Sequence, residues 1–237
     1  MDGAQGAGPK RPGAVFDTDD LLRFDRVTAL HGVRAAPWVV WSLKTVDEEN
    51  DSYLSSLWLA RGDGDAAPVQ LTAGTALDNQ PRVSPDGAYV AFASDRAGGP
   101  PQLHLIRRAG GEARKLTSFR EGVLQFGWRP DGRALWVTAE EKHGGKGPNV
   151  ARRVPYKLDG IGFTADTNCH LHVVELDQPG EPRRLTHGTF EVRDVCWLNE
   201  VVCIKRHYSI VFIPGFSISL LKRCNSFLHD LKIRLLI

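Results

Sequence analysis

Short apolar runs of strand length alternate with turn signals through most of the chain. Residues 89–92 and 134–137 are two such runs, and a Pro-Asp-Gly turn signal precedes each, at Pro85-Asp86-Gly87 and Pro130-Asp131-Gly132. Proline sets φ at the first turn position, aspartate hydrogen-bonds within the turn, and glycine accepts the positive φ that follows. Helical periodicity is weak, so the pattern predicts an all-β fold.

The turn signals belong to a repeat. In each unit a Leu-Thr pair precedes the turn position, and the offset is 13 residues from Thr72 to Pro85, from Thr117 to Pro130 and from Thr186 to Asn199. Each unit also begins with an apolar strand pattern, at residues 57–59, 103–105 and 171–173. About 45 residues with three or four short strands is the size of one β-propeller blade.

We therefore predict a partial, open β-propeller of about three to four four-stranded blades over residues 17–200. The blade repeats lie near residues 57–95, 103–139 and 171–200, and the longer step before the third unit places an insertion at about 142–168. Residues 38–41 align with 89–92 as a degenerate earlier unit. Residues 1–16, rich in Gly, Ala and Pro, are expected to be disordered.

Composition changes near residue 200. Residues 1–200 hold 24 Lys and Arg against 27 Asp and Glu, a net charge of −3, whereas residues 201–237 hold 6 against 1, a net charge of +5. This change indicates an aberrant or unstructured tail over 201–237, arising from a frame change, unspliced sequence or a premature end. Because the basic excess is confined to the tail, nucleic-acid binding is not predicted.

Several function classes are disfavoured by simple counts. Four cysteines without a C-x-x-C pair argue against a disulfide scaffold or a zinc ribbon. The first 14 residues lack the apolar core of a signal peptide, so we expect a cytoplasmic protein. A membrane anchor at residues 207–221 is the alternative for the tail, but it is interrupted by Pro214 and Gly215 and is shorter than the roughly 20 residues a span needs.

The body resembles the N-terminal propeller of prolyl-oligopeptidase-family serine peptidases. The branch it resembles most is the acylaminoacyl-peptidase-like or dipeptidyl-aminopeptidase-like one. The matching stretches are residues 84–96, 111–117, 153–163 and 170–176. The first two kinds of motif also occur in TolB-like propellers, whereas Tyr-Lys-x-Asp-Gly-x-Gly-Phe at 156–163 points more narrowly to the peptidases.

The resemblance implies that the propeller caps a C-terminal α/β-hydrolase domain, whose Ser-Asp-His triad carries its serine in G-x-S-x-G. This sequence contains no such motif. Gly215 to Ser219 lacks the second glycine, and Ser219 to Lys222 matches S-x-x-K without its partner motifs. We therefore expect a non-catalytic propeller fragment of a serine peptidase, which in the family admits short peptides to the hydrolase site. The alternative is a stand-alone TolB-like propeller that binds proteins or peptides.

Four further groups of residues could carry chemistry. Cys169, His170 and His172 lie close together, and imidazole and thiolate could bind zinc. His170 and His172 would face the same side of a strand, but no third and fourth ligand is evident beside them, so a structural role in a blade is favoured. Residues 47–51 form an acidic segment, which predicts a solvated hairpin loop. The alternative is that its carboxylates bind the amine of a substrate. Asn50-Asp51-Ser52 matches a glycosylation site that we expect to be unused.

The remaining candidates surround the insertion. Residues 142–148 superficially resemble a phosphate loop but lack its first glycine and its Ser or Thr, so a flexible loop is expected. Arg152, Arg153 and Lys157 could face substrate or a hydrolase domain. No metal, cofactor or catalytic residue is expected in this chain. The expected partners are a hydrolase domain and short peptides, and the fragment itself is expected to form oligomers or aggregates.

Overall fold

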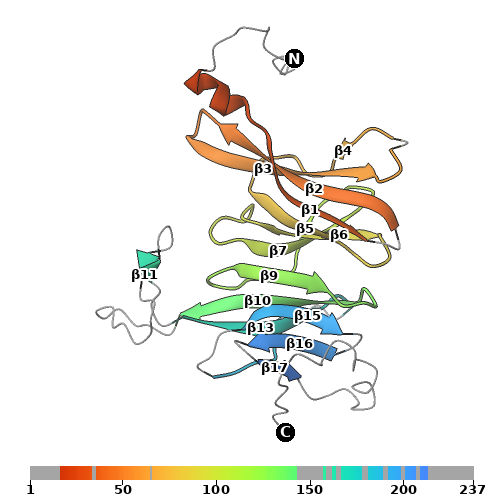
Figure 1. Cartoon of the computed structure of the whole chain (residues 1–237), viewed down its shortest axis with the longest axis vertical. Coiled ribbons are helices and arrows are strands. Elements are labelled where there is room, and N and C mark those ends of the chain that lie inside the picture. The colour runs from red at the N-terminus through yellow and green to blue at the C-terminus, as the bar shows by residue number, and fades with distance from the viewer. Residues whose placement is uncertain are drawn as a thin grey trace.

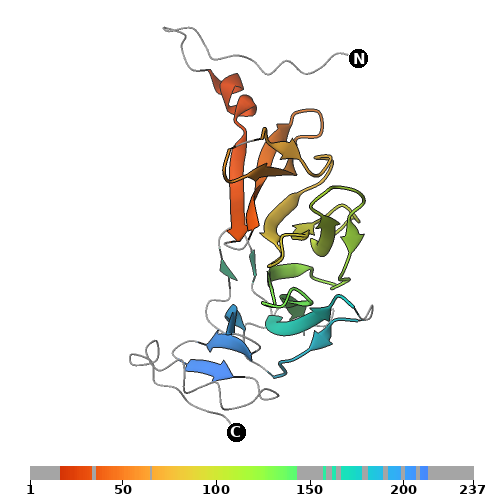
Figure 2. The same cartoon turned by 90° about the vertical axis from the view of Figure 1, so that its right-hand side faces the viewer.

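The computed structural model describes residues 17–33, 36–64, 66–142, 157–158, 162–163, 167–177, 181–188, 192–198, 201–206 and 209–212. Four antiparallel sheets follow one another along the longest axis of the molecule (Figure 1). Viewed from the side, they are arranged along an open arc (Figure 2). The predicted all-β, open propeller is confirmed. No α-helix occurs among the described residues, which hold one short 3-10 helix, η1 (Thr18–Arg23).

Three sheets have four strands each, joined in chain order. Blade A contains β1 (Arg26–Val33), β2 (Ala36–Asp47), β3 (Ser52–Arg61) and β4 (Val69–Gln70). Blade B contains β5 (Asp78–Val83), β6 (Tyr89–Ser94), β7 (Gln102–Arg107) and β8 (Arg114–Lys115). Blade C contains β9 (Val123–Trp128), β10 (Ala134–Lys142), β13 (Thr167–Glu175) and β14 (Arg183–Arg184).

Blade D has three described strands, β15 (Arg193–Leu198), β16 (Val201–Arg206) and β17 (Ser209–Phe212). The last two lie within the segment predicted to be an aberrant or unstructured tail, so the boundary expected at residue 200 falls inside a sheet. The predicted insertion runs between β10 and β13. Its described residues form only the short hairpin of β11 (Lys157–Leu158) and β12 (Gly162–Phe163). Residues 1–16 and 213–237 lie outside the described residues.

The aligned apolar patterns lie on equivalent strands. Residues 57–59, 103–105 and 171–173 belong to β3, β7 and β13, each of which is the third strand of its blade. Each sequence repeat therefore begins on the third strand of one blade and ends on the second strand of the next. The blades themselves are offset from the repeats predicted near 57–95, 103–139 and 171–200.

The two Pro-Asp-Gly triplets occupy equivalent turns between the first and second strands of blades B and C. The N–H of Gly87 donates to Ser84 O and that of Gly132 to Arg129 O, both at 2.9 Å. The two glycines have φ of 70° and 74°, values that favour glycine. In blade D, β15 ends at Leu198 and β16 begins at Val201, so Asn199 and Glu200 lie at the corresponding chain position.

Successive residues of β6 pack against different neighbouring blades. Val90 and Phe92 join the cluster shared with Val40 and Leu57 of blade A. Ala91 lies in the cluster shared with blade C, with Phe126 and Val137 among its members. Because side chains alternate across a strand, a strand covered on both faces must be apolar at every position. This explains why the sequence shows continuous apolar runs in place of polar–apolar alternation.

The first strands of consecutive blades contact one another, as expected for the inner strands of a propeller. The backbone N–H of Val83 in β5 donates to His31 Nδ1 in β1 at 3.1 Å. Trp128 Nε1 in β9 donates to the carbonyl of Arg82 in β5 at 2.9 Å. Burial and the nearby Arg82 guanidinium lower the pKa of His31, which favours the neutral ring that accepts this bond.

Candidate functional site: a polar network at one end of the blades

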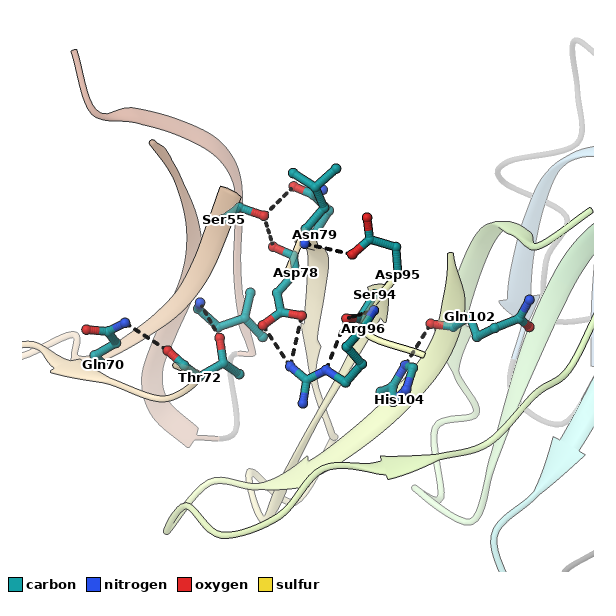
Figure 3. A network of polar contacts seen from close by, with 12 residues as sticks. Ser55, Gln70, Thr72, Asp78, Asn79, Ser94, Asp95, Arg96, Gln102 and His104 are labelled. Atoms are coloured by element: carbon teal, nitrogen blue, oxygen red, sulfur yellow. Dashed lines mark hydrogen bonds and ion pairs between the residues drawn. The ribbon is translucent and has the colours of Figure 1, made fainter. Parts of the chain in front are cut away.

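A buried ion pair lies where β5 begins. Asp78 is 1% exposed, and Arg96 Nη2 contacts its two carboxylate oxygens at 2.9 and 2.8 Å. The Arg96 guanidinium also lies over the Phe92 ring, 4.9 Å from its centroid. A buried carboxylate needs such a partner, because removing it from water without compensation costs several kcal/mol. Figure 3 shows this pair at the centre of a wider network.

Hydrogen bonds extend the network on either side of the ion pair (Figure 3). Ser94 Oγ accepts from the backbone N–H and Nε of Arg96, at 3.2 and 3.1 Å. Asp95 Oδ1 accepts the N–H of Leu77 at 2.9 Å. The Ser55 hydroxyl donates to the carbonyl of Asp78 at 2.8 Å, which joins blade A to blade B. The Ser94-Asp95-Arg96 sequence therefore anchors the start of an inner strand.

Gln102 organises the neighbouring part of blade B. Its Oε1 accepts from the Thr117 hydroxyl and from the N–H of Phe119, both at 2.9 Å, and its Nε2 donates to Phe119 O at 2.7 Å. The ring of His104 stacks on Phe92, and its Nδ1 lies 3.0 Å from Gln102 O. Burial is the main cause that lowers the pKa of His104, so the neutral ring donates to this carbonyl.

The strand order brings several other features to this end of the blades, which we call the Asp78 end. In each blade the first strand begins at the same end of the sheet as the connection between the second and third strands, because neighbouring strands are antiparallel. The acidic residues 48–51 join β2 to β3 there, and the insertion between Lys142 and Thr167 joins β10 to β13. The opposite end, with Pro85 and Pro130, we call the Pro-Asp-Gly end.

The described hydroxyl groups near acids or histidines serve structural roles. Ser84 Oγ donates to Asp86 Oδ1 at 2.5 Å and accepts the N–H of Tyr89, which closes the turn. Thr186 Oγ1 lies 3.3 Å from His170 Nδ1, but it is buried and already accepts the N–H of Leu171. Neither hydroxyl is accessible in the way a nucleophile requires.

The predicted Cys169, His170 and His172 group is part of a blade. All three side chains are buried on β13, and His172 packs against Phe119 of the preceding blade with ring centroids 4.8 Å apart. Burial is the main cause that lowers the pKa of His172, whose Nδ1 lies 3.2 Å from His170 O. Within the described ranges, no group of three or more His, Cys, Asp or Glu residues is placed to hold a metal ion.

The acidic residues 47–51 form the connection of the β2–β3 hairpin. The Asp47 carboxylate accepts from the backbone N–H of Asn50 at 3.3 Å and from its Nδ2 at 2.8 Å. Asp51 has φ of 47°, in the left-handed region that a tight connection uses. Asp47 therefore caps its own hairpin, which is the structural role favoured for this segment.

The other sequence candidates are mostly outside the described residues. These are residues 143–148 of the loop, Arg152 and Arg153, and residues 215–222 with both serine motifs. Of Lys157 only the backbone, in β11, is described. No helix in the described part of the chain is long and apolar enough to cross a bilayer.

Sequence reasoning missed the Asp78–Arg96 pair. The two residues are 18 positions apart and come together because β5 and β6 pair with Asp78 opposite Ser94. The signal that could have found them is an acidic residue at the start of a predicted inner strand, matched with an arginine just after the next strand.

Comparisons with known proteins show which proteins have similar blades. No protein-family model matches the chain. The peptidase YuxL of Bacillus subtilis, itself uncharacterized, is 34% identical over 191 residues, which are 73% of this chain and 28% of YuxL. The described blades are thus similar to propeller blades of prolyl-oligopeptidase-family peptidases.

Solved structures of these peptidases share the fold of the blades. The acylaminoacyl peptidase of Pyrococcus horikoshii superposes with a TM-score of 0.66 at 16% identity, over 77% of this chain and 28% of that one. A prolyl endopeptidase superposes with a TM-score of 0.51 at 18% identity, over 81% of this chain and 28% of that one. The chain thus spans less than a third of the length of these relatives.

Proposed function

We propose that these blades are the non-catalytic propeller portion of a longer serine peptidase, in which they restrict the substrates that reach an α/β-hydrolase site. The observation that carries this proposal is the contact between first strands, His31 with Val83 and Arg82 with Trp128. Because the first strands β1, β5 and β9 lie side by side, their edges line a common axis, as the inner strands do in a propeller with a central channel. A rigid channel passes an extended peptide and excludes a folded domain, which is wider.

The features at the Asp78 end support this role. The Ser55 hydrogen bond joins blade A to blade B where the inner strands begin, and the Asp78–Arg96 pair fixes the start of β5 within blade B. The connection between β10 and β13, from Lys142 to Thr167, is the long one among the connections at this end. Such loops on a rigid scaffold are suited to contact a substrate or a second domain.

Three observations test the proposal. The adjoining coding sequence is expected to contain a hydrolase region with G-x-S-x-G, and the longer protein is expected to cleave short peptides but not folded proteins. The chain alone is expected to show no labelling of any serine by a fluorophosphonate probe, because none of the serines that the structure describes is both accessible and placed beside a base that could activate it. An unrelated neighbouring sequence would favour a stand-alone peptide-binding propeller, and serine labelling would contradict the non-catalytic role.

A further inference from the structure

A cleft of about 430 Å³ lies between blades B and C at the Pro-Asp-Gly end. This volume is within the range of small-molecule sites. Its floor is apolar, made by Tyr89, Leu105 and Leu176. Its rim carries charged side chains from both blades, namely Arg107, Glu112, Arg114, Arg133 and Asp177.

The equivalent position between blades A and B is occupied by side chains. There the Arg108 guanidinium lies over the Trp38 ring, 4.5 Å from its centroid, and Arg61 lies 5.6 Å from the same ring. The strand registers make Tyr89 the counterpart of Trp38, because Tyr89 pairs with Arg107 as Trp38 pairs with Arg61.

The counterpart of Arg108 in blade C is Leu176. The N–H of Leu176 donates to Arg133 O as that of Arg108 donates to Ala88 O, each at 2.9 Å. Leucine is shorter than arginine and packs into the core between blades B and C. The repeat therefore accounts for the cleft: a guanidinium fills one blade junction, and its absence leaves the next junction open.

The rim of the cleft has three arginines whose charge is not neutralised by an ion pair. Arg107, Arg114 and Arg133 are exposed, and within the described part of the chain none of their guanidinium groups forms a salt bridge. Glu112 and Asp177 on the same rim are likewise without one. A carboxylate is one of the groups that a guanidinium binds in a planar, bidentate geometry. Two rim carboxylates disfavour a ligand with several negative charges, because like charges repel.

We propose that this cleft binds the free carboxylate end of a short peptide whose last side chain is apolar. The carboxylate would contact the arginines of the rim, and the apolar side chain would cover Tyr89, Leu105 and Leu176. The site is at the end of the blades opposite the Asp78 network, so it is independent of the proposed restriction of substrate access. Its failure and the failure of that function are separate outcomes.

The test uses the full chain and N-acetyl-phenylalanine, observed by saturation-transfer NMR, with N-acetyl-phenylalaninamide and inorganic phosphate as comparison probes. We expect the acid to bind with about millimolar affinity, as suits a small ligand in an open cleft, and the amide to bind at least about tenfold more weakly. Absence of binding by the acid, equal binding of acid and amide, or displacement of the acid by equimolar phosphate would each overturn the proposal.

Variants locate the site. Arg133→Ala and Arg114→Ala are each expected to weaken binding about tenfold, since each removes a charge-assisted hydrogen bond. Arg183→Ala is the matched control, because Arg183 occupies in blade C the register position of Arg114 but does not line the cleft, and it is expected to leave binding unchanged. Equal weakening by Arg183→Ala would contradict the proposal.

A filling variant gives a second, independent test. Leu176→Arg would place a guanidinium over Tyr89, as Arg108 lies over Trp38 between blades A and B. We expect it to abolish binding of N-acetyl-phenylalanine while the far-ultraviolet circular dichroism spectrum stays that of the wild type. Unchanged binding by this folded variant would show that the ligand does not occupy the cleft. If this variant does not fold, the arginine variants decide the result.

Discussion

The backbone N–H of Leu103 donates to the hydroxyl of Thr117 at 3.0 Å, and the same bond recurs in the two neighbouring blades. Leu57 donates to Thr72 and Leu171 to Thr186, each at 2.9 Å. The residue before each threonine pairs with the third strand through its own N–H, for example Leu116 with Leu103 O at 2.8 Å. Each fourth strand has only two ladder residues, so the threonine side chain satisfies the donor that the short strand leaves open.

Thr117→Val tests this role, because valine has nearly the same shape but no oxygen. The buried N–H of Leu103 would then lack an acceptor, and we expect the free energy of unfolding to fall by about 1–3 kcal/mol. The measurement is urea unfolding followed by tryptophan fluorescence. Thr117→Ser keeps the hydroxyl and should lose clearly less stability. If serine destabilises the chain more than valine does, the methyl group and not the hydroxyl matters at this position.

The repeat could be predicted from sequence because its parts are local. Thr72 and Thr117 each lie 13 residues before a turn proline, and both the Leu-Thr pair and the turn have a distinct local chemistry. The position within the repeat at which each blade begins could not be predicted in the same way. Whether Leu57 begins a unit or lies on its third strand depends on which strands pair, and pairing is decided by tertiary contacts.

The ion pair and the cleft could not be predicted from local sequence patterns, because both depend on how the strands pair. The Asp78–Arg96 pair depends on the register of β5 against β6. The cleft depends on Leu176 standing where another blade has Arg108, a difference with meaning only after the blades are superposed. The composition change at residue 200 indicates an aberrant or unstructured tail, and residues 201–206 and 209–212 within it form strands, since strand pairing tolerates wide changes in composition.

The Asp78–Arg96 pair gives a second prediction. Arg96→Met leaves the buried Asp78 carboxylate without its cation, and we expect a loss of about 2–3 kcal/mol, below the cost of fully buried pairs because Arg96 is 30% exposed. The double variant Asp78→Asn with Arg96→Met removes the charge as well and should be more stable than Arg96→Met alone. Urea unfolding of the two single variants and the double variant measures the coupling. Strict additivity of the two substitutions would show that the pair does not interact in solution.

The buried histidines predict a loss of stability in mild acid. Burial lowers the pKa of His31, His104 and His172 in the folded chain, and Arg82 lowers that of His31 further. Below the ordinary histidine value of about 6.5, the unfolded chain therefore binds protons that the folded chain does not. Stability should be constant above about pH 7 and should fall as the pH is lowered toward about 5.

His31→Gln isolates one of these contributions. Glutamine cannot titrate, and its amide oxygen offers an acceptor in place of His31 Nδ1 for the N–H of Val83. Urea midpoints measured between pH 5 and 8 should show a shallower fall for this variant than for the wild type. A wild-type midpoint that does not change over this interval would show that the three rings take up protons without cost to the fold.

The last prediction concerns the face of blade A that is turned away from blade B. Leu30 and Val27 on β1 are 65% and 53% exposed, and Leu30 lies in register with Trp41, which stacks on Trp58 with ring centroids 6.5 Å apart. An apolar sheet face of this kind drives association in water. We expect the chain to self-associate in size-exclusion chromatography with light scattering, and Leu30→Lys to reduce the mean mass. Val69→Lys, at a residue 63% exposed on the edge strand β4, is the control and should leave the mass unchanged. A monodisperse wild-type monomer would show that this face is not a site of association.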